Sequence, residues 1–421
     1  MKLQVIMTSV FVTFSMIFAE APFTTTNGTG TRAMGMANSY TAIANDYSAT
    51  FWNPAGLAFL PIREVHIGIG GSKLSGETMF DGKKTEYAKS QMELTSIGLV
   101  RALPTTKGGF AFALGYSKPY SLNDIRKFSG SDVYYDRDSM ELIPGVDTLH
   151  FGDTLYYDLF RYYTSGDLGL WSAAVGWQVA EGLGFGVTLS YLHGTQRSHK
   201  SILSHTSKGL FDDGTEISSE TKYNGYDLRI GGLYRFNSNV SIGALIEIPK
   251  VIYYEDEKRD GSFRYTYSGK LVSSLSGAVG AAATLPFATV SADVNFRSPN
   301  PDVDEGVLSH WKAGGGIGIE VPLQPTNIIL RGGYRYQELD FNPYAEYEDD
   351  ELVSDPILIG DKDNVQMFTA GLTFVLSKSI TFDAAYSFSN YSIVTIDQNW
   401  KNDIAESYDR HRAAATISIR Y

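Results

Sequence analysis

The feature that most constrains this chain is an alternation of apolar and polar or small residues, which begins near residue 62 and continues to the C-terminus. In residues 110–117, for example, Phe110, Phe112, Leu114 and Tyr116 alternate with small side chains. A period of two is typical of β-strands, because successive side chains point to opposite faces of the sheet. Counted along the chain, the pattern predicts an all-β fold of about 14 strands.

The connections between the predicted strands alternate in length. Those near residues 104, 182, 238, 286, 323 and 377 are short, and most of the others are long. Bacterial outer-membrane barrels have short periplasmic turns and long extracellular loops, with an even number of antiparallel strands. The sequence therefore predicts a closed transmembrane β-barrel whose even strand number keeps both termini on the same side.

The two faces of the strands differ in character. One face is apolar or aromatic, whereas the other carries charges such as Asp227, Arg229, Asp293 and Glu320. A soluble β-sandwich also buries one face of each strand, so alternation alone does not separate the two architectures. The barrel is favoured by an apparent export signal, by the alternating turn lengths and by aromatic residues at strand ends. These aromatics are Tyr116, Tyr191, Tyr234, Phe296, Tyr334, Tyr336 and Tyr421.

Residues 1–19 have the pattern of a secretory signal. Lys2 precedes an apolar run from Val5 to Phe18, and the small Ala19 stands before Glu20. The run is too short for a spanning helix and no stop-transfer charges follow it. The alternative is a buried N-terminal helix of a soluble domain. We expect export and a location in the bacterial outer membrane.

The composition agrees with a barrel and excludes several other classes. With 27 Tyr, 23 Phe and 42 Gly, the chain suits strands that carry aromatic girdles. It has no Cys, which excludes disulfide and thiolate chemistry. A formal net charge of −12 argues against nucleic acid as a partner.

A segment between the signal and the first strand, residues 29–60, is poor in bulky side chains. Gly, Ala and Ser dominate it, and Pro54 pushes Asn53 out of the helical region. A barrel of this size is too wide for its own side chains to fill. We therefore predict that residues 20–60 plug a barrel formed by residues 61–421, with Arg32, Asp46 and Asn53 hydrogen-bonded to its charged inner wall. Whether the plug moves or is a permanent cork stays open.

Three motifs in this segment resemble a known family. They are Gly30–Met36 (GTRAMGM), Ala42–Asp46 (AIAND) and Trp52–Ala58 (WNPAGLA), in that order after a signal. This order is similar to the N-terminal signature of FadL/TodX-type outer-membrane transporters of hydrophobic compounds, and equally to that of the related PorV-type barrels. The sequence departs from the pattern at Ala37-Asn38, where the family more often repeats glycine.

The resemblance implies a 14-stranded barrel whose lumen is closed by an N-terminal hatch. It also implies that hydrophobic ligands are caught at the extracellular loops and pass when the hatch shifts. Hatch roles carry over to the residues that match the motifs, which are Arg32, Asp46, Asn53, Pro54 and Ala55.

The insert from Lys118 to Gly166 contains a candidate capture surface. Residues 155, 156, 159, 160 and 163 would share one face of an amphipathic helix. In an extracellular loop, that face could form an apolar groove or could pack on other loops as a lid. The predicted capture residues are Leu155, Tyr156, Leu159 and Phe160, with Leu203 and Phe211 on the facing wall.

No catalytic, cofactor-binding or metal site is predicted. His193, His199 and His205 recur every six residues, which matches neither a strand nor a helix. The acidic run Asp349–Glu351 lacks the spacing of a calcium loop. The sequence shows no nucleophile elbow, phosphate loop or zinc signature, so an enzyme is not expected.

The sequence thus predicts passive outer-membrane transport of long-chain fatty acids or other hydrophobic compounds. The partners would be a hydrophobic small molecule and the surrounding lipid and lipopolysaccharide. The alternative is a PorV-type barrel that binds secreted proteins or a secretion machinery. A general diffusion porin is disfavoured, because a polar pore would not need a plug.

Overall fold

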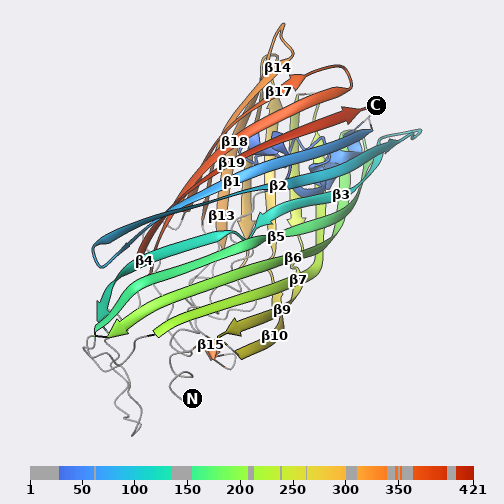
Figure 1. Ribbon diagram of the computed structural model, residues 1–421. Coiled ribbons are helices and arrows are strands. Elements are labelled where there is room, and N and C mark those ends of the chain that lie inside the picture. The colour runs from blue at the N-terminus through green and yellow to red at the C-terminus, as the bar shows by residue number, and fades with distance from the viewer. Residues whose placement is uncertain are drawn as a thin grey trace.

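The described residues form one antiparallel sheet that closes on itself (Figure 1). The computed structural model describes residues 28–60, 63–133, 154–206, 213–237, 239–261, 263–299, 311–338, 347–348, 351–352, 364–395 and 404–421. Closure is made by β1 (Glu64–Phe80) and β19 (Ile404–Arg420), which pair from Glu64 with Arg420 to Met79 with Ala405. The predicted export signal, residues 1–19, lies outside the described residues.

The other wall strands follow in chain order. They are β2 (Lys83–Leu103), β3 (Phe110–Ser121), β4 (Asp124–Val133), β5 (Thr154–Ala180), β6 (Leu183–Thr206), β7 (Asp213–Arg235), β8 (Val240–Glu247), β9 (Val251–Asp260), β10 (Phe263–Val272), β11 (Ser276–Thr284), β12 (Thr289–Arg297), β13 (Lys312–Leu323), β14 (Ile328–Glu338), β17 (Asn364–Val375) and β18 (Ile380–Thr395). A separate ribbon consists of β15 (Tyr347–Glu348) and β16 (Glu351–Leu352).

Three of the wall strands are interrupted once. Both β3 and β4 pair with β5, and both β8 and β9 pair with β7. Across the next position, β10 pairs with β9 and β11 pairs with β8. Counted with each interrupted strand as one, the described residues form a closed barrel of fourteen antiparallel strands. This confirms the predicted fold class and strand number.

The short connections lie where the sequence predicted them, for example at residues 181–182 between β5 and β6. The predicted long inserts were wrong in extent. Much of Lys118–Gly166 and His193–Asn224 belongs to β4, β5, β6 and β7, which continue as paired strands. Beyond a bilayer both faces of a strand can be polar, so the apolar alternation ends although the hydrogen-bonded ladder does not. The predicted helix over residues 155–163 is therefore part of β5.

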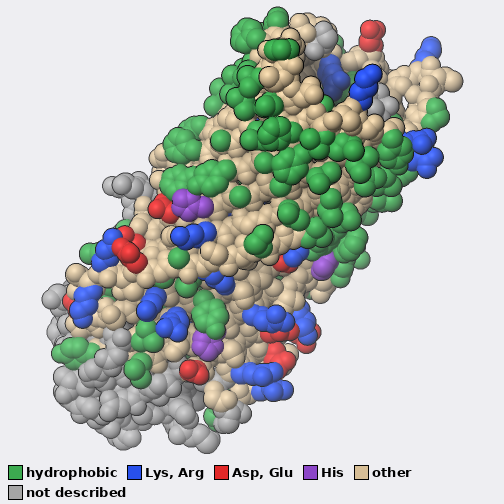
Figure 2. Space-filling view, turned by 45° about the horizontal axis from the view of Figure 1, so that its top comes forward, with side chains coloured by type: hydrophobic (Ala, Val, Ile, Leu, Met, Phe, Trp, Pro, Cys, Tyr) green, Lys and Arg blue, Asp and Glu red, His purple; other side chains and the backbone are tan. Residues whose placement is uncertain are grey.

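The outer face carries an apolar band (Figure 2). On adjacent strands Trp171, Tyr191 and Tyr226 stand opposite one another and are exposed, which places an aromatic belt across β5, β6 and β7. Exposed aliphatic residues such as Leu189 and Ile230 follow toward the short-turn end. Charged side chains gather on the other half of this surface (Figure 2). An apolar band edged by aromatics is the lipid-facing surface of a membrane barrel.

Residues 28–60, which we call the luminal segment, lie inside the barrel near the short-turn end (Figure 1). They contain α2 (Thr31–Gly35), α3 (Ala49–Trp52) and the 3₁₀ helix η2 (Pro54–Phe59). One end packs on β14, β17, β18 and β19 through α2, and the other packs on β3, β5, β6 and β7 through η2. Within the described residues, no helix is both long enough and apolar enough to cross a membrane.

The lipid-facing band predicts a position-dependent cost of charge. Replacing Leu189 with Lys puts an ammonium group on the outer face within the band. We expect this to lower the free energy of unfolding by about 2–4 kcal/mol. The measurement is urea-induced unfolding of the barrel in lipid vesicles.

The matched control is Thr195→Lys, on the same face of β6 but beyond the aromatic belt, where we expect little change. Equal effects of the two substitutions would contradict the assignment of the band to lipid.

Candidate functional site

The luminal segment packs closely on the wall at positions where the wall has glycine, in part through its own backbone. A Cβ atom added at Gly186 would lie 2.2 Å from the Pro54 carbonyl carbon, and one at Gly231 would lie 2.1 Å from Asn53 Oδ1. At Gly243 it would lie 2.3 Å from the Thr41 carbonyl oxygen. Since even a methyl group would collide at these places, the wall glycines allow the segment to fill this part of the lumen.

Asn53 fastens the η2 end of the segment to β7. Its side chain is fully buried, and Nδ2 donates hydrogen bonds to the carbonyl oxygens of Thr41 at 2.8 Å and Gly232 at 3.0 Å. Its Oδ1 accepts from the Ala55 N–H at 3.1 Å, which caps η2 where Pro54 begins it. An amide has both donors and acceptor, so one side chain satisfies three backbone groups.

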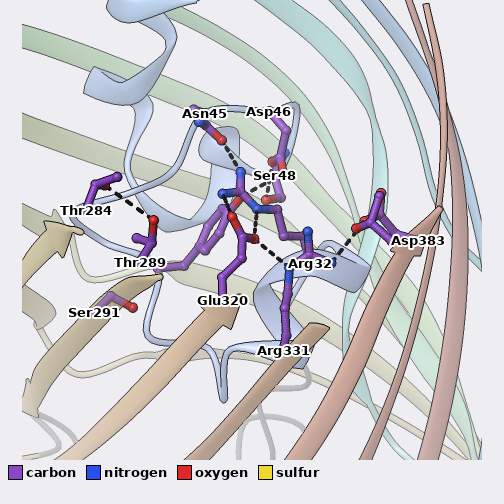
Figure 3. Close-up of polar contacts among 12 residues, drawn as sticks. Arg32, Asn45, Asp46, Ser48, Thr284, Thr289, Ser291, Glu320, Arg331 and Asp383 are labelled. Carbon is purple, nitrogen blue, oxygen red and sulfur yellow. Dashed lines mark hydrogen bonds and ion pairs between the residues drawn. The ribbon is translucent and has the colours of Figure 1, made fainter. Parts of the chain in front are cut away.

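Arg32 fastens the α2 end of the segment to β13 (Figure 3). Its Nε and Nη2 donate to the two carboxylate oxygens of Glu320 at 2.8 and 3.0 Å. Glu320 also accepts from Arg331 Nε at 2.6 Å, and Arg331 Nη1 donates to Asp383 at 3.1 Å. A bidentate guanidinium–carboxylate pair fixes orientation as well as distance, so α2 is held in one register against the wall.

Asp46 holds the segment to itself rather than to the wall (Figure 3). It accepts hydrogen bonds from the Tyr40 hydroxyl at 2.7 Å, the Ser48 N–H at 2.8 Å and the Ser48 hydroxyl at 2.5 Å. Burial raises the pKa of Asp46, but the nearby Arg32 charge and these hydrogen bonds outweigh burial and leave the pKa below its ordinary value. The ionised form therefore stabilises the docked segment.

Asp293 on β12 is a wall contact that the motif resemblance missed. Its Oδ2 accepts from the Tyr40 N–H, the Thr41 N–H and the Thr41 hydroxyl at 2.7–2.8 Å. The side chain is 4 % exposed. The sequence offered one signal, an acidic residue on the inward face of a strand, but nothing in it indicated the partner.

A buried charge cluster underlies α3. Arg229 donates to Asp227 at 2.9 Å and to the Phe51 carbonyl at 2.9 Å, and its guanidinium lies 3.9 Å from the centre of the Phe51 ring. Lys250, beside the break between β8 and β9, contacts Asp227 at 3.2 Å and also pairs with Glu247. Because cations and carboxylates are paired, the cluster can hold Phe51 without an isolated buried charge.

On the long-loop side of this cluster the lumen is lined by apolar residues that we call the inner apolar cluster. Phe51 of the luminal segment is a member, and the rest come from the wall. The full set is Phe51, Tyr120, Leu122, Leu168, Leu170, Leu192, Tyr223 and Ile252, with Trp52, Tyr254 and Leu271 packed against it. The segment thus presents an aromatic ring to an apolar region of the lumen.

The opposite side of the segment is polar. A cavity of about 380 Å³ opens there at the short-turn end. Its lining includes Arg32, Asp46, Glu64, Arg331 and Arg420. The segment therefore separates an apolar compartment from a charged one, as expected of a partition between a hydrophobic site and water.

The predicted hatch residues make different kinds of contact. Arg32 and Asn53 bond to the wall, Asp46 bonds within the segment, and Pro54 and Ala55 lie in η2 against the wall glycines. Their motion, and so the name hatch, stays a prediction. Ala37 and Asn38 have φ values of 52° and 58°, a left-handed conformation that glycine adopts without strain, which explains a family preference for glycine there.

The predicted capture residues do not share a face. In β5, Phe160 stands opposite the buried Ile202, whereas Leu159 stands opposite the exposed Leu203 on the other side of the sheet. Tyr156 is exposed, Leu155 belongs to β5, and Phe211 lies outside the described residues. The prediction that these residues share one helical face was wrong, because in a strand neighbouring side chains point to opposite faces of the sheet.

Solved structures with the same architecture identify the fold. The chain resembles the Pseudomonas putida toluene transporter TodX at a TM-score of 0.58 and 14% identity, covering 94% of this chain and 99% of that one. A Pseudomonas aeruginosa FadL homologue matches at a TM-score of 0.63 and 12% identity, covering 93% of this chain and 98% of that one. The Ralstonia pickettii toluene transporter TbuX matches at a TM-score of 0.55 and 14% identity, covering 94% of this chain and 99% of that one. The fold is that of the FadL/TodX-type barrels.

This agreement extends over nearly the whole chain and confirms the fold that the N-terminal motifs implied. It also gives the chain the architecture of a bacterial outer-membrane protein. No protein-family model matches the sequence. No curated protein matches it either.

The hydrogen bonds of Asp293 allow a prediction of how much this residue stabilises the docked luminal segment. In Asp293→Ala, the two N–H groups and the hydroxyl it now accepts from lose their partner. We expect the luminal segment to be destabilised by about 2–4 kcal/mol relative to the docked state. The measurement is the rate of limited proteolysis within residues 28–60. The electrophoretic mobility of the unheated protein checks that the barrel itself stays folded.

Asn295→Ala is the control, since Asn295 is the next inward residue of β12 and bonds to Arg335 rather than to the segment. Equal protease sensitivity of the two variants would contradict the role given to Asp293.

The lowered pKa of Asp46 predicts that docking of the luminal segment weakens in acid. Because its pKa is lowered in the folded protein, the ionised group contributes stability above its ordinary pKa, and this contribution is lost as the pH falls through the lowered value. We expect protection of the Ser48 amide from hydrogen exchange to be constant near neutral pH and to fall in acid below pH about 4. In Asp46→Asn the protection should be weaker at neutral pH and nearly independent of pH. An acid transition of equal size in that variant would exclude Asp46 as its cause.

Proposed function

We propose that this protein is a passive outer-membrane transporter of hydrophobic compounds in which the luminal segment acts as the hatch. The observation that carries the proposal is the position of Phe51. Its ring belongs to the inner apolar cluster, and its carbonyl accepts from Arg229 of the wall. A ligand in the cluster would therefore contact the barrel and the segment at the same time.

The driving force for loading is burial of apolar surface. Each methylene group of the ligand that is buried contributes about 0.8 kcal/mol to the binding free energy. A hydrocarbon of a few carbons can therefore compensate for the packing that its neighbours lose when the Phe51 ring is displaced. A ligand that displaces this ring also removes the stacking surface of Arg229. The ligand can then shift the equilibrium of the segment by the difference between its affinities for the docked and displaced states. No nucleotide is required.

Release requires the α2 end of the segment to leave the wall. That end is held by polar contacts, of which Arg32 with Glu320 and Thr31 with Thr416 are two. Polar contacts beside a cavity with a charged lining can exchange for contacts with water, at a lower cost than leaving a group unpaired in an apolar core. We therefore assign the moving part to α2 and its neighbours, while Asn53 and η2 hold the other end.

A disulfide across this contact tests the proposal. The hydroxyl oxygens of Thr31 and Thr416 lie 2.7 Å apart, so the two side chains point toward each other, as those of a bonded cysteine pair must. The chain has no Cys of its own, so Thr31→Cys with Thr416→Cys adds only this pair. We expect oxidation to reduce uptake of N-phenyl-1-naphthylamine by expressing cells at least roughly tenfold, because the α2 end can no longer move.

Reduction of the same double variant should restore uptake, and the single variant Thr416→Cys should behave like the unmodified protein under both conditions. Unchanged uptake by the fully oxidised variant would mean that the segment is a permanent cork.

A further inference from the structure

Three aromatic side chains stand in a row on β10. Phe263, Tyr265 and Tyr267 are 52%, 42% and 48% exposed. Their ring centres are separated by 6.4 Å from one rung to the next, with interplanar angles of 22° and 24°. Such a spacing makes a regular aromatic ladder along one face of the strand, and these large apolar surfaces are not consumed by packing.

The register places this ladder on the luminal face. Leu271, on the same strand, stands opposite Ile252 of β9, and both residues line the inner apolar cluster. Tyr267, Tyr265 and Phe263 precede Leu271 by four, six and eight residues, all even spacings, so they share its face. The ladder therefore extends from the tip of the β9–β10 hairpin toward the inner apolar cluster.

At the heights of Tyr265 and Tyr267, the neighbouring strands are polar on the same face. Opposite Tyr267 lies Asp256 of β9, followed by Thr221 of β7 and Gln196 of β6. Opposite Tyr265 the series is Lys258, Ser219 and Ser198. A hydrophobic molecule that moved along these strands would have to desolvate polar groups without bonding to them. The ladder avoids that cost.

We propose that Phe263, Tyr265 and Tyr267 form the entry track along which an uncharged aromatic hydrocarbon reaches the inner apolar cluster. The inference rests on the proposed transport function. An aromatic ligand gains ring–ring attraction at each rung beyond the burial of its surface, which an aliphatic chain of equal area does not. Because the rungs are alike and evenly spaced, the ligand steps between sites of similar affinity and is not trapped at any of them.

The test is the rate at which cells expressing the full-length protein take up N-phenyl-1-naphthylamine, a neutral aromatic probe. In F263S/Y265S/Y267S, we expect the rate to fall roughly tenfold, the change that loss of one or two aromatic contacts produces. Y265F/Y267F keeps the rings and should match the unmodified protein. F263L/Y265L/Y267L keeps apolar surface without rings, and should slow the aromatic probe several-fold while leaving uptake of a fluorescent fatty acid unchanged.

Tyr253→Ser is the matched control, because Tyr253 is an equally exposed aromatic on the same hairpin but on the opposite face of the sheet. Each variant is first shown to reach the outer membrane as a heat-modifiable barrel. If the serine triple variant takes up the probe at the unmodified rate, the ladder is not the track. If the leucine variant slows both probes equally, the preference for aromatic ligands is wrong.

These outcomes are separable from failure of the proposed function. In that case the unmodified protein would take up the probe no faster than cells without it, and the oxidised Thr31–Thr416 disulfide would have no effect. An effect of the disulfide together with no effect of the ladder substitutions would overturn only the entry track.

Discussion

The structure depends on the pairing of β1 with β19, which removes the last free edges of the sheet. A sheet without edges can satisfy its backbone groups in lipid, where none could bond to water. Closure also gives every strand an inside and an outside. The same alternation then has two consequences, a lipid-facing band of residues such as Leu189 and Trp171, and an inner wall that carries Asp227, Arg229 and Asp293.

An enclosed polar wall creates a second requirement, because the lumen must be filled without leaving charges unpaired. The luminal segment meets it in two ways. At wall glycines such as Gly186 and Gly243, it approaches the wall through its backbone. Where the wall carries charge, it supplies Arg32 for Glu320 and backbone donors for Asp293. Dense packing and polar satisfaction therefore coincide at the same surface.

The arrangement around Phe51 connects the filling of the lumen to the proposed transport. One ring lies between an apolar compartment and a saturated charge cluster, so displacement of the ring changes both. The ladder on β10 extends the apolar compartment toward the long-loop end, beside strands that are polar at the heights of Tyr265 and Tyr267. Entry, holding and opening would then occur on a series of aromatic and apolar surfaces that leads from the β10 ladder to Phe51.

The strand number and the closed barrel could be predicted from the sequence. So could those residues fastening the segment that lie in a motif, as Arg32 and Asn53 show. Local alternation and motif chemistry suffice for these features, because each is encoded within a few residues of the chain. Three features could be seen only in the folded barrel: residues 155–163 continue a strand, Asp293 binds Tyr40 and Thr41, and the aromatics of β10 face the lumen. Each of these depends on the register between strands, and register is set by pairing across the closed sheet rather than by the residues of one strand.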